Sequence, residues 1–164
     1  MHRKMRRFTQ ELPLAESKEI LLRGRECVLA VDGDNDYPYA VPVNYVYDGE
    51  NHIYVHSAVA GHKIDSIVRN PKVSLCVIDK GEIVPAEFTT YFRSVIVFGH
   101  ARLMDDMDDK IKALRTLSDK YSPGIDPTDE INRFMKVVAI IEITIDKISG
   151  KEAKELMMQR VPRT

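Results

Sequence analysis

The sequence predicts a mainly β fold with α insertions, built around a six-stranded antiparallel β-barrel. Three observations predict this class. The spacing of apolar residues changes from helical to strand-like after Gly24. The alternating runs that follow are separated by short turns, such as Asp48-Gly49-Glu50-Asn51, that favour hairpins. Helical segments fall between some of these runs, as insertions in a β-domain do.

Six segments have the length and alternation expected of strands. Pro38 and Pro42 cannot donate ladder hydrogen bonds, so the second segment should be irregular or lie at a sheet edge. The stretch 79–86 is polar, and we expect it to be irregular. The six predicted strands are 27–31, 37–47, 52–57, 73–77, 88–103 and 137–146.

Four helices are expected between and before these strands. The first should end at Gly24, and the second should end at Asn70-Pro71. The third begins with four aspartates, which suit the positive end of a helix dipole. The predicted helices are 14–23, 61–69, 105–121 and 130–134. We expect residues 1–164 to form a single domain, with 1–12 and 152–164 as peripheral tails.

Composition excludes several classes of protein. The 164 residues are 44% apolar and 30% charged, with a net charge of −1, so no overall field favours nucleic acid or an anionic membrane. Cys27 and Cys76 fit neither a disulfide framework nor a zinc motif. The longest aliphatic run, 137–141, is too short to span a bilayer. No apolar stretch follows the basic start, so we expect no signal peptide and a cytoplasmic location.

The end of the third strand predicts an anion site. The strand ends at His56-Ser57, the chain turns through 58–61, and a helix begins near His62. Free backbone N–H groups at a helix start bind phosphate, and Ser57 and Lys63 add a hydroxyl and a cation. Gly61 would allow close approach of the backbone. This pattern alone also occurs in many proteins that bind no ligand.

The stretch around this site resembles the FMN-binding split barrels of the pyridoxamine 5′-phosphate oxidase superfamily. The nitroimidazole-resistance-type branch, which carries segments of the form PYxxPxN, YxHSAxxGxK and SVxxxG, is the most similar. The likeness runs from about Arg6 to Lys151, nearly the whole chain. The matching segments here are Pro38–Asn44 (PYAVPVN), Tyr54–Lys63 (YVHSAVAGHK) and Ser94–Gly99 (SVIVFG).

The resemblance implies an FMN site at specific positions of this chain. The ring of the cofactor would lie along the first group below, the second would flank the ring and ribityl chain, and the third would hold the phosphate. A fourth group would complete the site, together with residues from a second subunit. The first group is Val41, Pro42, Val43 and Asn44, and the second is His56, Ser57 and Ala58. The third is Gly61, His62 and Lys63, and the fourth is Ser94 and Val95.

His56 is the candidate catalytic residue. A histidine titrates near neutral pH, so His56 could donate a proton to a reduced substrate. Ser57 cannot be its nucleophilic partner, because adjacent residues on a strand point to opposite faces. His52 shares a strand face with His56, but no third ligand stands at a recognisable spacing, so we expect no metal site.

A homodimer with the flavin at the subunit interface is also expected. The strand segment 92–98 is apolar on both faces, so its outer face needs cover, and a two-fold interface provides it. The alternative is that the helix 105–121 covers this face within one chain.

The predicted function is that of an FMN-dependent oxidoreductase, a reductase of a small aromatic or nitro-type acceptor. The absence of tryptophan and the ending 152–164 are unlike a true pyridoxamine 5′-phosphate oxidase. One alternative is a non-catalytic carrier or sensor that binds flavin or haem; related split barrels also include users of the deazaflavin F420. A structural dimer with an empty cleft is the third reading.

Overall fold

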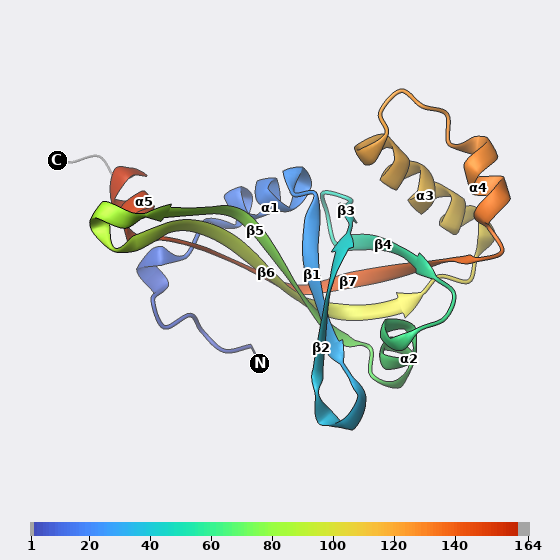
Figure 1. The fold of residues 1–164 in the computed structure, drawn as a ribbon, viewed down its shortest axis with the longest axis horizontal. Helices are drawn as coiled ribbons and strands as arrows, with labels where there is room; N and C mark the ends of the chain where they lie inside the picture. The colour runs from blue at the N-terminus through green and yellow to red at the C-terminus, as the bar shows by residue number, and fades with distance from the viewer. Residues whose placement is uncertain (1, 161–164) are drawn as a thin grey trace.

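The computed structural model describes residues 2–160 and shows a mainly β chain with one seven-stranded antiparallel sheet (Figure 1). The order of strands in the sheet is β2-β1-β5-β6-β7-β4-β3. Pro38 and Pro42 lie in β2 at the sheet edge, as predicted from their missing donors. The strands are β1 (Glu26–Asp32), β2 (Pro38–Asn44), β3 (Val46–Tyr47), β4 (His52–Ala58), β5 (Lys72–Val84), β6 (Thr89–Leu103) and β7 (Val138–Glu152).

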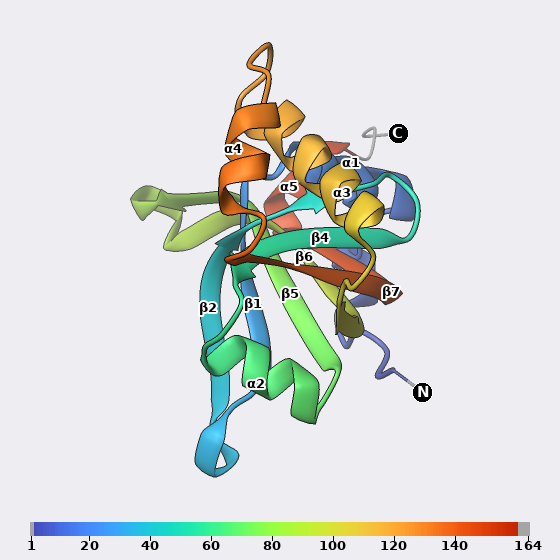
Figure 2. The same ribbon diagram turned by 90° about the vertical axis from the view of Figure 1, so that its right-hand side faces the viewer.

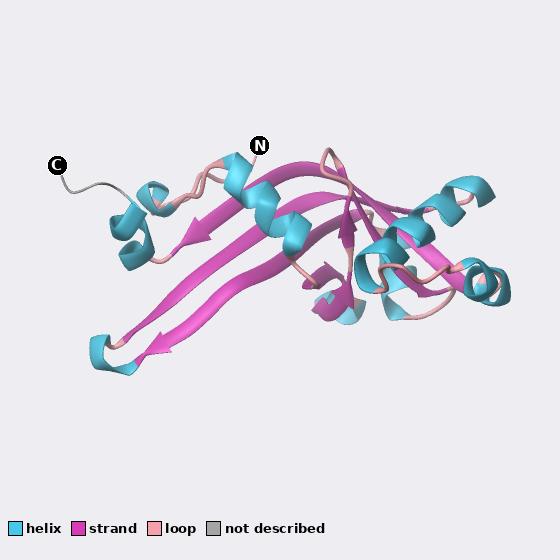
Figure 3. Cartoon of the chain, turned by 90° about the horizontal axis from the view of Figure 1, so that it is seen from above, coloured by secondary structure: helices cyan, strands magenta, loops and turns pink. Residues whose placement is uncertain are grey.

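The predicted helices form close to their expected bounds, and a further helix follows β7. The first ends at Gly24, whose N–H donates to the Ile20 carbonyl. At the start of the third, the side chain of Asp106 accepts the N–H of Asp109 as an N-cap. No helix between residues 2 and 160 is long and apolar enough to cross a membrane. The helices are α1 (Leu14–Arg23), α2 (His62–Arg69), α3 (Met107–Tyr121), α4 (Thr128–Phe134) and α5 (Lys154–Arg160), drawn from above in Figure 3.

The sheet is strongly curled but not closed. Its two edge strands, β2 and β3, are separated in the chain by Tyr45 alone, so the two edges must meet there. Figure 2 shows β1 and β2 crossing β4 and β7 steeply as a result. Among residues 2–160, no ladder joins β2 to β3 or β4, which leaves one side of β2 free.

The predicted number of six strands is wrong because the segment 37–47 forms two strands. Residues 38–44 pair with β1, whereas Val46 and Tyr47 pair with β4. Tyr45 belongs to neither ladder, and its fully buried side chain donates a 2.8 Å hydrogen bond to the Leu21 carbonyl. The alternation of apolar residues continues through this change of partner, so the pattern did not reveal it.

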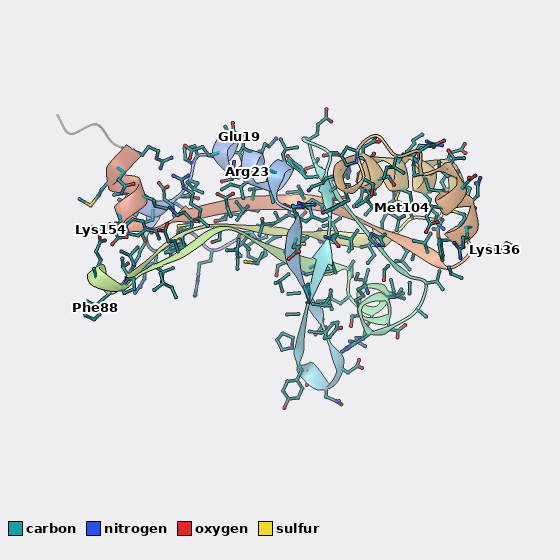
Figure 4. All side chains as sticks on the ribbon, turned by 45° about the horizontal axis from the view of Figure 1, so that its top comes forward. Glu19, Arg23, Phe88, Met104, Lys136 and Lys154 are labelled. Atoms are coloured by element: carbon teal, nitrogen blue, oxygen red, sulfur yellow. The ribbon has the colours of Figure 1, made fainter. Side chains whose placement is uncertain are left out.

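The prediction of an irregular 79–86 segment is also wrong. β5 continues to Val84 after a register shift at Asp79, and its last residues pair with Thr89–Arg93 of β6. The result is a long hairpin, here called the β5–β6 arm (residues 79–93), with Phe88 at its tip (Figure 4). A polar sequence forms strands here because the hairpin is exposed to solvent and needs no apolar face.

Two groups of buried side chains stabilise the fold. The larger fills the curl of the sheet and includes Leu29, Ile53, Val55, Leu75, Val97 and Ile143. The smaller lies between α3 and the outer side of β3, β4 and β7, and includes Val46, Met104, Ala113, Leu117 and Ile140. α3 and α4 therefore cover the outer side of the sheet at one end of the molecule (Figure 2).

The segments expected to be peripheral tails contribute to the packed structure. Leu12 is buried, and its N–H donates to the Gly150 carbonyl. After β7, Ala153 and Leu156 are buried, and the fully buried carboxylate of Glu152 pairs with Arg93 and Arg160. Met1 and residues 161–164 of these segments lie outside the described residues.

Replacement of Tyr45 by phenylalanine should destabilise the protein. The change leaves the ring but removes the buried hydrogen bond to the Leu21 carbonyl, which should lower the free energy of unfolding by about 1–2 kcal/mol. The control is Tyr37→Phe, at a side chain that is 75% exposed, where a change within about 0.5 kcal/mol is expected. Urea unfolding of both variants measures the difference, and equal stabilities would contradict a structural role for the Tyr45 hydroxyl.

Candidate functional site

The turn between β4 and α2 presents free backbone groups beside the sheet edge. Gly61 precedes α2 with a φ of 131°, a conformation that other residues rarely adopt, and nothing lies within 4 Å of where its Cβ would be. Its carbonyl accepts the N–H groups of Ile64 and Asp65, which starts the helix. The N–H groups of the first turn have no acceptor within the helix and are available to an anion.

Lys63 and His62, at the start of α2, have different surroundings. The half-buried Lys63 makes no ion pair or hydrogen bond within residues 2–160. His62 stacks on the Tyr39 ring at 4.1 Å between centroids, and its Nε2 atom accepts the Asp34 N–H at 3.3 Å. The structure therefore leaves the charge of Lys63 free for a ligand, while His62 connects α2 to the β1–β2 hairpin.

Arg69, at the other end of α2, strengthens this connection. Its guanidinium donates to the carbonyls of Asp32 and Gly33 at 2.8 and 2.9 Å, and it pairs with the Asp34 carboxylate at 3.2 Å. The helix start and the hairpin that contains β2 are thus held together by contacts at both ends of α2.

The β2 residues expected along a flavin ring alternate between two environments. Val41 and Val43 pack against the core, whereas Pro42 and Asn44 are exposed on the outer side. Because β2 is an edge strand, the backbone groups on its free side have no partner strand. A flat ligand could lie against this side and bind the backbone.

A cleft of about 530 Å³ lies between β4 and the helices α3 and α4. Four of the predicted site residues line it: Asn44, His56, Ser57 and Ala58. Apolar side chains of the two helices form the opposite wall, among them Leu114, Leu117, Ile131 and Phe134. The predicted site residues of β4 thus meet Asn44, the last residue of β2, at one cavity.

His56 and Ser57 point to opposite sides of β4, as predicted. His56 is exposed and makes no hydrogen bond or ion pair within residues 2–160. Ser57 is only 7% exposed, and its Oγ atom has no hydrogen-bond partner among the described residues. The two side chains therefore cannot act as a nucleophile and base, and His56 is the one open to solvent.

Ser94 and Val95 do not line this cleft. On β7, the partner of His56 is Ile140 and the partner of Ser94 is Lys151, eleven residues further on. At about 3.3 Å per residue the separation along the strand is roughly 35 Å. Val95 is also fully buried in the core. Within one chain, however, Ile96 of the same strand lies only three strand spacings, about 15 Å, from Pro42 of β2, by way of Cys76 and Val28.

Sequence reasoning missed the contribution of the two helices after β6. Leu114, Leu117, Ser118 and Tyr121 recur at helical spacing along α3, and all four line the cleft. This spacing was the available signal, but it also fits a helix that simply packs on the sheet. Tyr121 further donates to the Tyr45 carbonyl at 2.7 Å, and burial raises the pKa of its hydroxyl.

An edge strand with a free side, a helix start with free N–H groups and an apolar cleft are features typical of β-domains that bind a cofactor. Residues 13–152 match the family model described as pyridoxamine 5′-phosphate oxidase, and the chain belongs to this flavin-binding family. The resemblance in the motifs is thereby confirmed. No curated protein sequence matches the chain.

Several solved structures share the fold. A protein from Bacteroides thetaiotaomicron described as a 5-nitroimidazole antibiotic resistance protein has a TM-score of 0.73 and 23% identity over 87% of this chain and 86% of its own. An FAD-binding protein from Mesorhizobium loti has a TM-score of 0.66 and 27% identity over 88% and 97%. An FAD- and haem-binding protein from Mycobacterium smegmatis has a TM-score of 0.73 and 15% identity over 93% and 80%.

Proposed function

We propose that this protein binds FMN and acts as a reductase of a small aromatic or nitro-type acceptor. The observation that carries the proposal is that His56, Ser57 and Ala58 at the end of β4 line the cleft, and that the chain reaches the α2 start and the free Lys63 within five residues of Ala58. The phosphate would be held by Gly61, Lys63 and first-turn N–H groups. The ring would lie along Val41–Asn44, with His56, Ser57 and Ala58 beside it.

The charges near the helix start favour an anion. The α2 dipole and Lys63 both contribute positive potential at the turn, against the one carboxylate of the first helical turn, Asp65. The nearest acidic side chain of the hairpin, Asp34, is paired with Arg69 at 3.2 Å and lies 3.6 Å from His62, which offsets its charge. Because a Cβ at Gly61 would meet nothing within 4 Å, a phosphate has room to approach the backbone there.

The residues of this chain would position the reactants and deliver a proton. When bound, the flavin supplies electron or hydride transfer. The backbone of β2 would hold the polar edge of the ring, and the apolar walls of the cleft would exclude water from it. His56 is exposed and unpaired within residues 2–160, so it is free to donate a proton to a reduced acceptor. A reduced nicotinamide is the proposed electron donor.

A second candidate function is a non-catalytic carrier that binds flavin or haem. The relatives that bind FAD, or FAD and haem, support this candidate. The visible spectrum of the purified protein separates the cofactors, and oxidation of NAD(P)H in the presence of a nitroaromatic separates an enzyme from a carrier. A colourless protein that FMN does not stabilise against heat would contradict both.

We propose further that the protein is a homodimer. α3 packs against β3, β4 and β7 and so does not cover the 92–98 segment of β6. On the outer side of the central strands, Ile78 is 68% exposed, and Val28 and Phe98 are each 37% exposed. A second copy on this face would cover these side chains and could bring Ser94 to the flavin.

Reversal of the charge of Lys63 should weaken FMN binding. Lys63→Glu removes a charge-assisted contact and adds repulsion, so the Kd for FMN should rise by about tenfold or more. The control is Lys18→Glu, which makes the same charge change at a half-buried lysine on α1. Fluorescence titration of FMN measures both constants; equal affinities would exclude Lys63 from the phosphate site.

Loss of the His56 imidazole should slow turnover more than it weakens binding. In His56→Ala, kcat for nitroaromatic reduction should fall by about tenfold or more, while the Kd for FMN changes little. The control is His52→Ala, at a histidine that pairs with Asp48 and lies outside the cleft. A kcat unaffected by the His56 substitution would rule out its role as proton donor.

A charged residue on the outer face should separate the subunits. Ile78→Asp would place a carboxylate in the proposed interface, so we expect the variant to be a monomer in sedimentation velocity. Ile125→Asp is the matched control, because the Ile125 side chain is also 68% exposed but lies between α3 and α4. A monomeric wild-type protein would contradict the proposed dimer.

A further inference from the structure

We infer that the cleft between β4, α3 and α4 is a binding site for a small, uncharged aromatic molecule. This inference rests on the proposed function for one point, the identity of that molecule as the electron acceptor. The binding itself does not depend on a flavin.

The size and walls of the cleft fit such a molecule. Its volume of about 530 Å³ lies within the range of small-molecule sites in proteins. Leu117 and Ile131 are 5% and 7% exposed, so this wall is already formed by packed side chains. Phe134 and Val138 extend the apolar surface, against which a flat ring can pack.

The polar groups of the cleft favour an uncharged ligand. Among the described residues that line it, no lysine or arginine occurs, and Glu130 is the one carboxylate. Apart from His56 on the β4 side, the lining offers no basic side chain, so a phosphate or carboxylate held against α3 and α4 would lose its hydration without gaining a permanent cation, at high energetic cost. Asn44 and Ser118 can instead form hydrogen bonds with a neutral polar substituent.

The described C-terminal helix, α5, does not line the cleft. Val138 lines the cleft, and Glu152, at the other end of the same strand, precedes α5 at the opposite end of the molecule (Figure 1). Fourteen residue steps along β7 separate the two residues, which corresponds to about 45 Å of strand.

The position of the cleft explains how its ligand would meet the proposed flavin. Asn44 belongs both to the strand proposed to carry the ring and to the cleft wall. His56 faces the same cavity from β4. A ligand held against α3 and α4 would therefore lie beside the ring, within reach of the His56 imidazole.

Nitrobenzene is a suitable uncharged probe, with 4-nitrobenzoate as its anionic counterpart. Calorimetric titration should show that the full-length protein, with and without FMN, binds nitrobenzene at least about tenfold more tightly than 4-nitrobenzoate. Equal or tighter binding of the anion would overturn the inferred ligand class. Nitrobenzene binding without any FMN binding would support this site while contradicting the proposed function.

Two variants that fill the cleft test its location. Ile131→Trp and Ser118→Trp should each weaken nitrobenzene binding by about tenfold or more, whereas Ile125→Trp in the exposed α3–α4 connection should not. Ser118 is half-buried, so its variant should fold even if Ile131→Trp does not, and circular dichroism checks both. Unchanged binding in a folded Ser118→Trp would overturn the inference.

Binding of nitrobenzene by the Ile78→Asp monomer but not by the wild-type dimer would also overturn the inference, because a second copy of the chain would then fill the cleft.

Discussion

The curl of the sheet depends on one residue that connects its two edges. Tyr45 follows β2 and precedes β3, and its ring is fully buried. Its hydroxyl donates to the Leu21 carbonyl at 2.8 Å, its N–H donates to the Tyr121 hydroxyl at 3.0 Å, and its carbonyl accepts from Lys120 at 2.9 Å. Side chain and backbone of one residue thus join α1, α3 and both edge strands. Burial raises the pKa of the Tyr45 hydroxyl, so the group stays protonated and remains a donor at neutral pH.

The candidate site is a consequence of this connection. Asn44 immediately precedes Tyr45, so the contacts that hold Tyr45 also place the end of β2 at the cleft. Lys120 contributes from α3, where its ammonium donates to the Gly24 and Tyr45 carbonyls and lies 4.2 Å from the centre of the Tyr45 ring. Burial lowers the pKa of Lys120, and the two carbonyls and the aromatic ring compensate for the lost hydration of the charge. The helix that forms one wall of the cleft is therefore fixed to the end of β2, whose last residue, Asn44, also lines the cleft.

Much of this arrangement could be predicted from sequence, because local patterns determine it. The alternation in the 137–146 segment and the turn residues at 48–51 were sufficient to identify strands and hairpins. The change of pairing partner at Tyr45 was not predictable, because it depends on contacts with α1 and α3, far away in the chain. The cleft was missed for the same reason: its walls come from segments some sixty residues apart. His62 fitted a phosphate-binding motif, but only the structure reveals that Tyr39 and Asp34 already engage its ring.

The attachment of α2 to the β1–β2 hairpin bears on the entropy of ligand binding. His62 and Arg69 hold the helix to the loop that connects β1 to β2, so the proposed phosphate and ring contacts belong to one rigid unit before any ligand arrives. Ordering of the chain then costs little free energy on binding, so each contact contributes nearly all of its interaction energy to the affinity. Such a preorganised unit favours slow release, which suits a group that stays with the protein through many catalytic cycles.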